Sequence, residues 1–311
     1  MRAYLAGVTN RPKDEARGLA LVACSTLAYG VLPILGKLAY AAGVTPLPLL
    51  AWRYAIAAAL IAAIDRSPPL PLRTRLRLWA VGGVFVFNSI AYFRALETIP
   101  ASVTSLVLYT YPVLVALLAG AAGLERLTPR GLLAALAAFV GCALTAGGAP
   151  AGERLSTAGV AWALLAAVIY ASYIVLSSRF GAGVPARALA MHLSQVAAVV
   201  CSGAALWGEG LALPAAPQAW LSVAGIGVVS TVVAMTTFLA GMALVGPTRA
   251  SVLSSLEVIV TLAFAFLFLG ERLAALQWLG ALLILGAVAW QNAGALRALA
   301  GRRPRTGGAR G

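Results

Sequence analysis

The sequence has few charged side chains for its length. Only 10% of its 311 residues are charged, whereas 61% are hydrophobic. Soluble domains usually carry roughly 25% charged residues, so this chain lacks the polar surface that keeps a globular protein in water. Its long apolar runs fit the hydrocarbon core of a bilayer as helices, whose backbone groups bond to one another. The composition predicts an all-α integral membrane protein.

Motifs for metal, redox and nucleotide chemistry are also missing. The three cysteines, Cys24, Cys142 and Cys201, lie far apart within apolar segments, and there is one histidine. No CxxC spacing, no Cys/His ligand spacing and no GxxxxGK[ST] loop occurs. One histidine and one carboxylate deep in an apolar segment do not make a catalytic set. We therefore expect no cofactor, no metal and no enzymatic activity.

Positive charge is in excess, and its placement indicates a membrane rather than nucleic acid. The formal net charge is +14, and the basic residues lie mainly in short connections and at the chain ends. If the N-terminus is cytoplasmic, eighteen Lys and Arg fall on the cytoplasmic side and two on the other. This bias predicts a multi-pass protein of the cell (inner) membrane with both termini in the cytoplasm. It also argues against nucleic-acid binding, since no recognition motif accompanies the charge.

Ten apolar segments separated by Gly, Pro or charged residues predict ten transmembrane helices. Their expected ranges are 18–42, 47–65, 77–98, 101–122, 130–149, 158–180, 186–208, 218–243, 248–269 and 273–296. Pro33 and Pro112 fall in the middle of the first and fourth segments, where a missing backbone hydrogen bond can kink a helix.

The two halves of the chain echo each other. Leu-Glu-Arg-Leu at 124–127 returns as Gly-Glu-Arg-Leu at 270–273, 146 positions later, and Tyr29 leading to Lys37 resembles Tyr170 leading to Arg179. Five spans per half is an odd number, so the second half must enter the membrane from the opposite side. We expect inverted five-helix repeats at 1–149 and 150–296, followed by a basic cytoplasmic tail at 297–311 that contacts lipid headgroups.

These motifs carry a family resemblance. The second copy reads Arg-Ala-Ser-Val-Leu-Ser-Ser-Leu-Glu-Val at 249–258, then Gly-Glu-Arg-Leu, then Trp-Leu-Gly at 278–280. Over residues 18–296 the chain resembles EamA-type transporters of the drug/metabolite transporter superfamily. The resemblance implies export of amino acids, other metabolites or drugs. One departure is Glu257-Val258, where family copies commonly have Glu-Pro, so the ninth span is expected to lack a kink that its relatives have.

Ionisable side chains within spans are costly in a bilayer and are therefore candidate functional residues. Glu257 is the only carboxylate near the middle of a span, and it could carry a proton or face a substrate amine. The alternative is a structural ion pair with Lys37, Arg53 or Arg94. Arg53 lies deepest of these cations. Lys37 and Arg94 are expected at the outer side, where they would attract an anion or reach the headgroups.

Polar and aromatic side chains in other spans complete the candidate substrate-binding set, because small-molecule sites are mostly apolar with a few placed polar groups. His192 has a further interpretation, a histidine hydrogen-bonded within the helix bundle. The full set is Arg53, Asn88, Tyr92, Tyr111, Tyr170, Tyr173, His192 and Glu257.

The sequence thus predicts a secondary transporter that moves small organic metabolites, amino acids or related solutes, across the cell membrane by alternating access. Proton coupling through Glu257 is open, and the substrate, the coupling ion and the oligomeric state stay undetermined. The alternative function is a channel or a non-transporting membrane scaffold. Saturable solute flux would distinguish a carrier from both.

Overall fold

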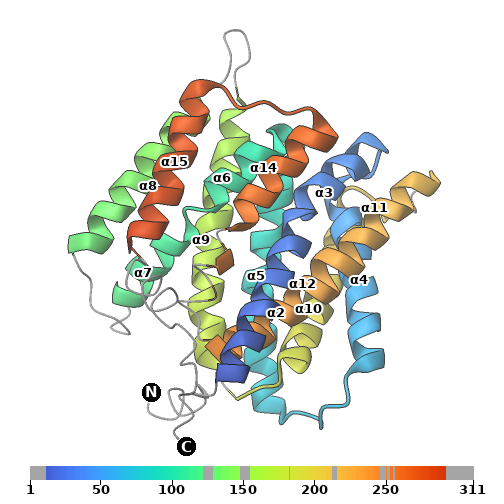
Figure 1. The fold of residues 1–311 in the computed structure, drawn as a ribbon. Helices are drawn as coiled ribbons and strands as arrows, with labels where there is room; N and C mark the ends of the chain where they lie inside the picture. Colours follow the sequence, from blue (N-terminus) through green and yellow to red (C-terminus); the bar gives the residue numbers. More distant parts are fainter. Residues whose placement is uncertain are drawn as a thin grey trace, which may run out of the picture.

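The computed structural model describes residues 12–121, 129–147, 155–181, 183–211, 216–245, 250, 253–254 and 256–291. Within these ranges the chain is helical in ten segments, one for each predicted span (Figure 1). The first half contains α2 (Pro12–Gly30) with α3 (Leu32–Ala41), α4 (Pro46–Ile64), α5 (Leu72–Thr98), α6 (Ala101–Leu108) with α7 (Tyr111–Ala121), and α8 (Pro129–Gly147). The second half contains α9 (Thr157–Phe180), α10 (Ala186–Trp207), α11 (Pro217–Gly227) with the π-helix η1 (Val228–Val233) and α12 (Ala234–Val245), α14 (Leu256–Leu269), and α15 (Ala275–Gln291).

The helices are apolar enough to cross a membrane. Six described stretches have the length and hydropathy of membrane spans, and the shorter apolar helices cover 101–115, 136–145, 256–269 and 275–290. Together they confirm the predicted all-α membrane fold. The prediction was wrong at two starts: α2 begins six residues and α5 five residues before the expected position. Those first turns, which contain Asp14, Glu15, Arg73 and Arg75, are too polar for the apolar pattern that defined the segments.

The most extensive helix packing joins one half of the chain to the other. Helix α5 packs along α9, α8 along α15, α4 along α10, and α2 along α12. Helices α8 and α15 stand at one side of the bundle, and α4 and α11 stand at the opposite side (Figure 1). These contacts follow the repeat. The contact of α5 with α9 joins spans three and six, and its counterpart after exchange of the halves joins spans eight and one, which is the contact of α12 with α2. The halves therefore interleave and do not form two separate lobes.

Close backbone approach holds the pair α8 and α15 together. A Cβ placed on Gly280 would lie 2.5 Å from the Gly141 carbonyl oxygen and 2.4 Å from Thr145 Oγ1. A Cβ on Gly141 would lie 2.7 Å from the Gly280 carbonyl oxygen. Small residues at such crossings allow membrane helices to gain van der Waals contact that larger side chains prevent.

Three of the described spans are interrupted between their ends. Span one breaks at Val31, two residues before Pro33, and span four breaks at Tyr109 and Thr110, just before Pro112. These two breaks agree with the kinks that the prolines predict. Span eight winds into η1, for which the sequence gives no comparable signal. Helix α14 has no such break, and it continues from Leu256 through Val258.

Side chains from the second half bond to the backbone at the break in span one. Ser230 Oγ of η1 donates to the Ala28 carbonyl at 2.8 Å, and Thr261 Oγ1 of α14 donates to the Gly30 carbonyl at 3.2 Å. Carbonyls released by a helix break need such partners in a membrane interior. The break is therefore part of the packed structure and lies against both η1 and α14.

Candidate substrate-binding site

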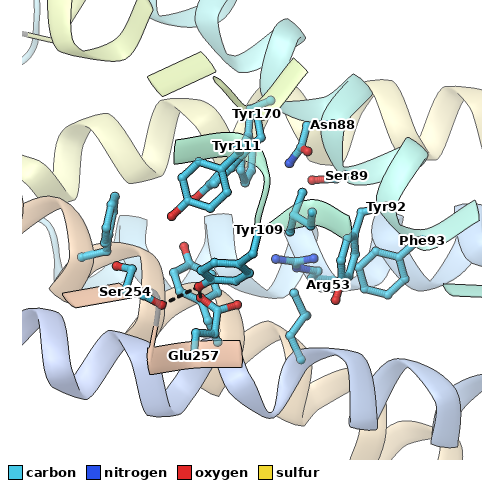
Figure 2. A pocket seen from close by; sticks show the side chains of 15 residues that line it. Arg53, Asn88, Ser89, Tyr92, Phe93, Tyr109, Tyr111, Tyr170, Ser254 and Glu257 are labelled. Carbon is cyan, nitrogen blue, oxygen red and sulfur yellow. Dashed lines mark hydrogen bonds between the residues drawn. The ribbon is translucent and has the colours of Figure 1, made fainter. Parts of the chain in front are cut away.

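A cavity lies where the interrupted spans meet in the middle of the bundle (Figure 2). It contains about 640 Å³ of space free of protein atoms, part of which is open to solvent. Its walls come from both halves of the chain. They are formed by Tyr29, Leu32, Arg53, Phe85, Asn88, Ser89, Tyr92, Phe93, Leu108, Tyr109, Tyr111, Tyr170, Phe238, Ser254 and Glu257.

Arg53 of α4 supplies the positive charge of the cavity. It is only 3% exposed, and its Nε donates a 2.7 Å hydrogen bond to Thr231 Oγ1 in η1. The guanidinium carbon lies 4.7 Å from the centre of the Tyr54 ring and 5.6 Å from that of Phe93. Among the described residues, Arg53 forms no ion pair. The aromatic faces stabilise the cation without neutralising its charge, so the site retains positive charge for an anionic group.

Glu257 of α14 supplies the negative charge. Its carboxylate accepts a 2.7 Å hydrogen bond from the Tyr109 hydroxyl, which also lies 2.5 Å from the Ser254 carbonyl oxygen. The alternative prediction, an ion pair with Lys37, Arg53 or Arg94, is wrong for the described part of the chain, where the ion pairs join Arg94 to Glu97 and Glu209. Glu257 thus faces the cavity with a hydroxyl partner and, within the described ranges, without a cationic one.

Asn88 of α5 adds an unused hydrogen-bond acceptor. The side chain is 8% exposed, and its Oδ1 has no hydrogen-bond partner among the described residues. Its neighbour Ser89 is already bonded to Tyr54, with 2.5 Å between the hydroxyl oxygens. A buried acceptor left without a partner is costly, and a bound donor such as an amine or hydroxyl would satisfy it.

Aromatic rings form most of the remaining wall. The ring centres of Tyr111 and Tyr170 lie 4.7 Å apart at 80°, and those of Tyr109 and Tyr111 lie 5.4 Å apart. Across the cavity, Tyr92 and Phe93 meet edge to face at 5.7 Å. Figure 2 shows Tyr109 beside Glu257, and Tyr92 and Phe93 beside Arg53. The wall offers flat apolar surface to the body of a solute, between the two charges.

Corresponding positions of the two repeats both line this cavity. Tyr29 and Tyr170 lie 141 positions apart and both line it. At the 146-residue spacing of the Glu-Arg-Leu motifs, Tyr111 corresponds to Glu257 and Leu108 to Ser254, and all four residues line the cavity. The two halves thus contribute equivalent positions, but only the second places a carboxylate there.

Comparison with known proteins agrees with this arrangement. The EamA-like transporter family matches the sequence twice, over residues 16–147 and 157–292. The chain belongs to the EamA-like transporter family. A curated relative, the uncharacterized transporter YcbK of Bacillus subtilis (strain 168), is 28% identical over 281 residues, which is 86% of this chain and 90% of YcbK. This EamA-like protein is therefore a multi-pass membrane transporter and not an enzyme.

A solved crystal structure is similar to this EamA-like transporter over 91% of its chain and 99% of the solved chain. The TM-score is 0.67 at 21% sequence identity. At that identity, the similarity shows the fold alone.

Six of the eight predicted substrate-binding residues of this EamA-like transporter line the cavity. Tyr173 lies one layer behind, with its ring stacked on Tyr170 at 5.7 Å and 4.9 Å from the Phe85 ring. His192 is bonded to Gln195 at 3.1 Å and packs on Trp79, away from the cavity lining. The predicted outer-side cations, Lys37 and Arg94, also lie outside the lining.

The sequence interpretation missed several residues of the lining. Tyr29 and Tyr109 were visible as tyrosines within spans, and the repeat could have singled out Tyr29 through its echo at Tyr170. Ser89 and Ser254 carried no signal above that of ordinary packing residues. Within the described ranges, no cluster of His, Cys, Asp or Glu has the composition of a metal site.

Proposed function

We propose that this EamA-like protein is a secondary transporter of small organic metabolites, amino acids or related solutes, which it exports across the cell membrane by alternating access. The observation that carries the substrate class is that Arg53 and Glu257 line the same cavity but form no ion pair with each other. Among the residues that the structure describes, each of the two charges has only neutral hydrogen-bond partners. A solute that carries both a carboxylate and an amine complements this arrangement.

The remaining lining supports the same class. The carboxylate of such a solute would contact the Arg53 guanidinium, and its amine would contact Glu257 and the unpartnered Asn88 Oδ1. Aromatic rings would enclose the apolar body. Charge-assisted hydrogen bonds are stronger than neutral ones and lend the site orientation as well as affinity.

Alternating access is supported by the position of the cavity between the halves. Transporters built from inverted repeats bind their solute near the membrane midplane, at broken helices on the repeat interface. Here the interrupted spans one, four and eight, together with equivalent positions of both halves, surround the site. We propose the inverted repeats at 1–149 and 150–296 on this ground. The Lys and Arg bias orients both termini, and the 297–311 tail, toward the cytoplasm.

Proton coupling through Glu257 is the energetic part of the proposal. An unpaired carboxylate in a membrane interior is expensive when ionised, and such groups commonly serve proton relays in transporters. Glu257 would release its proton when the substrate amine arrives, so that one site exchanges the two cations.

The test is counterflow. Purified protein in liposomes is preloaded with one unlabelled compound from a panel of amino acids, nucleobases and cationic drugs, and uptake of the labelled compound is followed with and without a pH gradient. Saturable exchange of one class, which unlabelled solute competes, would establish a carrier and name its substrate.

The other outcomes separate the alternatives. Flux that does not saturate would indicate a channel, and exchange of drugs without exchange of amino acids would contradict the proposed substrate class. A pH gradient that leaves accumulation unchanged would remove proton coupling and leave the carrier intact.

A further inference from the structure

Two glutamates of the second half cap the starts of two helices of the first half, all at one end of the bundle. This end, which we call the Glu271 end, carries the C-termini of α3 and α5 and the N-termini of α4 and α6 (Figure 1, top). By the charge bias it faces the outside. None of the residues in these caps lines the cavity.

The first cap joins Glu271 to α6. One carboxylate oxygen accepts from the Ala101 backbone N–H at 2.8 Å, and the other accepts from the Ser102 N–H at 2.9 Å and the Ser102 hydroxyl at 2.7 Å. The first N–H groups of a helix lack partners within the helix, and the N-terminus attracts negative charge. Three hydrogen bonds thus hold the turn after α14 to the start of span four.

The Gly-Glu sequence of the repeated motif explains this geometry. Gly270 has φ +65°, a left-handed conformation that favours glycine, and the Glu271 N–H bonds back to the Ala265 carbonyl at 3.1 Å. The chain therefore turns sharply at the end of α14, in a conformation that glycine adopts without steric cost. The turn directs Glu271 across to α6, so the motif sets the position of the cap.

The second cap joins Glu209 to α4 and α5. Glu209 follows α10 and accepts a 3.0 Å hydrogen bond from the Leu47 backbone N–H in the first turn of α4. Its other carboxylate oxygen pairs with Arg94 near the end of α5. Arg94 also pairs with Glu97 at 3.2 Å, but that pair lies within α5. Glu209 therefore ties three segments together, and Glu97 ties none.

The helices that the caps join contribute to the walls of the cavity. Arg53 lies on α4, one residue separates Tyr92 from Arg94 on α5, Leu108 ends α6, and Glu257 lies on α14. Separation of these helices at the Glu271 end would open the cavity wall toward that end. The caps hold their ends together, and neither glutamate makes a described bond within its own preceding helix through its side chain.

We propose that Glu271 and Glu209 form an outer latch, a pair of carboxylate caps that closes the Glu271 end and must release for the cavity to open to the outside. The latch rests on the alternating access proposed above and adds the residues that restrain one of its two states. Each cap is charge-assisted and exposed to water once broken, so it can break and re-form during a cycle.

The test measures access to the cavity and needs no substrate. In a variant in which Cys24, Cys142 and Cys201 are replaced by serine, Leu108→Cys places a reporter thiol in the cavity wall. A membrane-impermeant thiol reagent is applied to intact cells, and its reaction rate is compared with and without Glu271→Gln or Glu209→Gln. Glu97→Gln is the matched control, since it removes an equal charge at the same end without crossing between helices.

Both latch variants are expected to react about tenfold faster or more, because each removes hydrogen bonds to a charged group, and Glu97→Gln is expected to react at the parent rate. Ser102→Ala, which removes one of the three bonds to Glu271, should give a smaller increase and serves if Glu271→Gln does not fold. Parent-like rates in Glu271→Gln, Glu209→Gln and Ser102→Ala would overturn the latch.

Orientation and transport are read out separately. Thr157→Cys, at the exposed start of α9, should react from outside, and Ser67→Cys, at the opposite end, should not. If the two results are reversed, the orientation fails, and the same latch comparison is made in inside-out vesicles. A latch confirmed by access in a protein without counterflow would leave the latch standing and contradict the proposed transport.

Discussion

The Tyr109 hydroxyl donates a 2.7 Å hydrogen bond to the Glu257 carboxylate. Tyr109 lies at the break in span four, and Glu257 lies in the first turn of α14, so the bond joins the two halves of the chain inside the cavity. It also orients a carboxylate that has no ion pair among the described residues. The break in span four thus helps to place the negative charge of the site.

Tyr109→Phe is expected to raise the KM for exchange about tenfold or more, because hydrogen bonds to charged groups contribute roughly 1.5–3 kcal/mol. Tyr173→Phe is the control, since Tyr173 lies behind the cavity wall and is a hydrogen-bond partner of neither Glu257 nor Arg53 in the described structure. Counterflow kinetics give both values. Equal KM values for the two variants would contradict the role of the Tyr109 bond.

Thr231→Val is expected to weaken substrate affinity about tenfold, because it removes the 2.7 Å hydrogen bond that positions Arg53. Thr231→Ser keeps the hydroxyl and should stay within about twofold of the parent protein, which is a factor that corresponds to less than 1 kcal/mol. The measurement is KM and maximal rate for all three proteins. If Thr231→Ser loses as much affinity as Thr231→Val, the hydroxyl is not the feature that matters.

His192→Gln is expected to leave the KM and its pH dependence unchanged. His192 is 5% exposed, bonded to Gln195 and packed against Trp79, and it does not line the cavity. Counterflow measured at several pH values checks this expectation. A pH profile that shifts in His192→Gln would place this histidine in the transport cycle after all.

Gly280→Ala is expected to destabilise the fold by about 1–3 kcal/mol, since its methyl group would overlap backbone and side-chain atoms of α8. Gly286→Ala on the same helix meets nothing within 4 Å and serves as the matched control. Thermal unfolding in detergent should show a Tm lower by several degrees for the first variant alone. An equal Tm for both would show that α8 and α15 can separate without cost.

The sequence predicts the helices well because the hydropathy of a segment, and the Gly and Pro residues that end it, determine the helix locally. All ten spans correspond to helical segments, and Pro33 and Pro112 lie at two of the breaks. The π-helix in span eight was not predicted, because Val-Val-Ser-Thr-Val-Val at 228–233 reads as an ordinary apolar stretch. Its winding is stabilised by partners that only the fold brings near, such as the Ala28 carbonyl for Ser230.

The candidate site was predicted in part, for a related reason. The sequence shows which residues are polar within a span, but the interleaving of the halves decides which face of each helix meets the cavity. Arg53, Asn88 and Glu257 face it, whereas His192 meets its own helix neighbour and Trp79. Arg94 was predicted as an outer-side cation, with Glu257 as its alternative partner, and it proves to be paired with Glu209, 115 positions away. Pairs this distant leave no local pattern.

The central claim is that solute passes through the cavity between Arg53 and Glu257. Its most direct test compares the counterflow rates of the parent protein, Arg53→Gln and Glu257→Gln in proteoliposomes. Glu97→Gln serves as the control for loss of a carboxylate elsewhere. The account predicts saturable exchange of a solute that carries both a carboxylate and an amine, a loss of about tenfold or more in Arg53→Gln and Glu257→Gln, and a parent-like rate in Glu97→Gln. Exchange at the parent rate in both cavity variants, with the proteins folded and equally reconstituted, would contradict it.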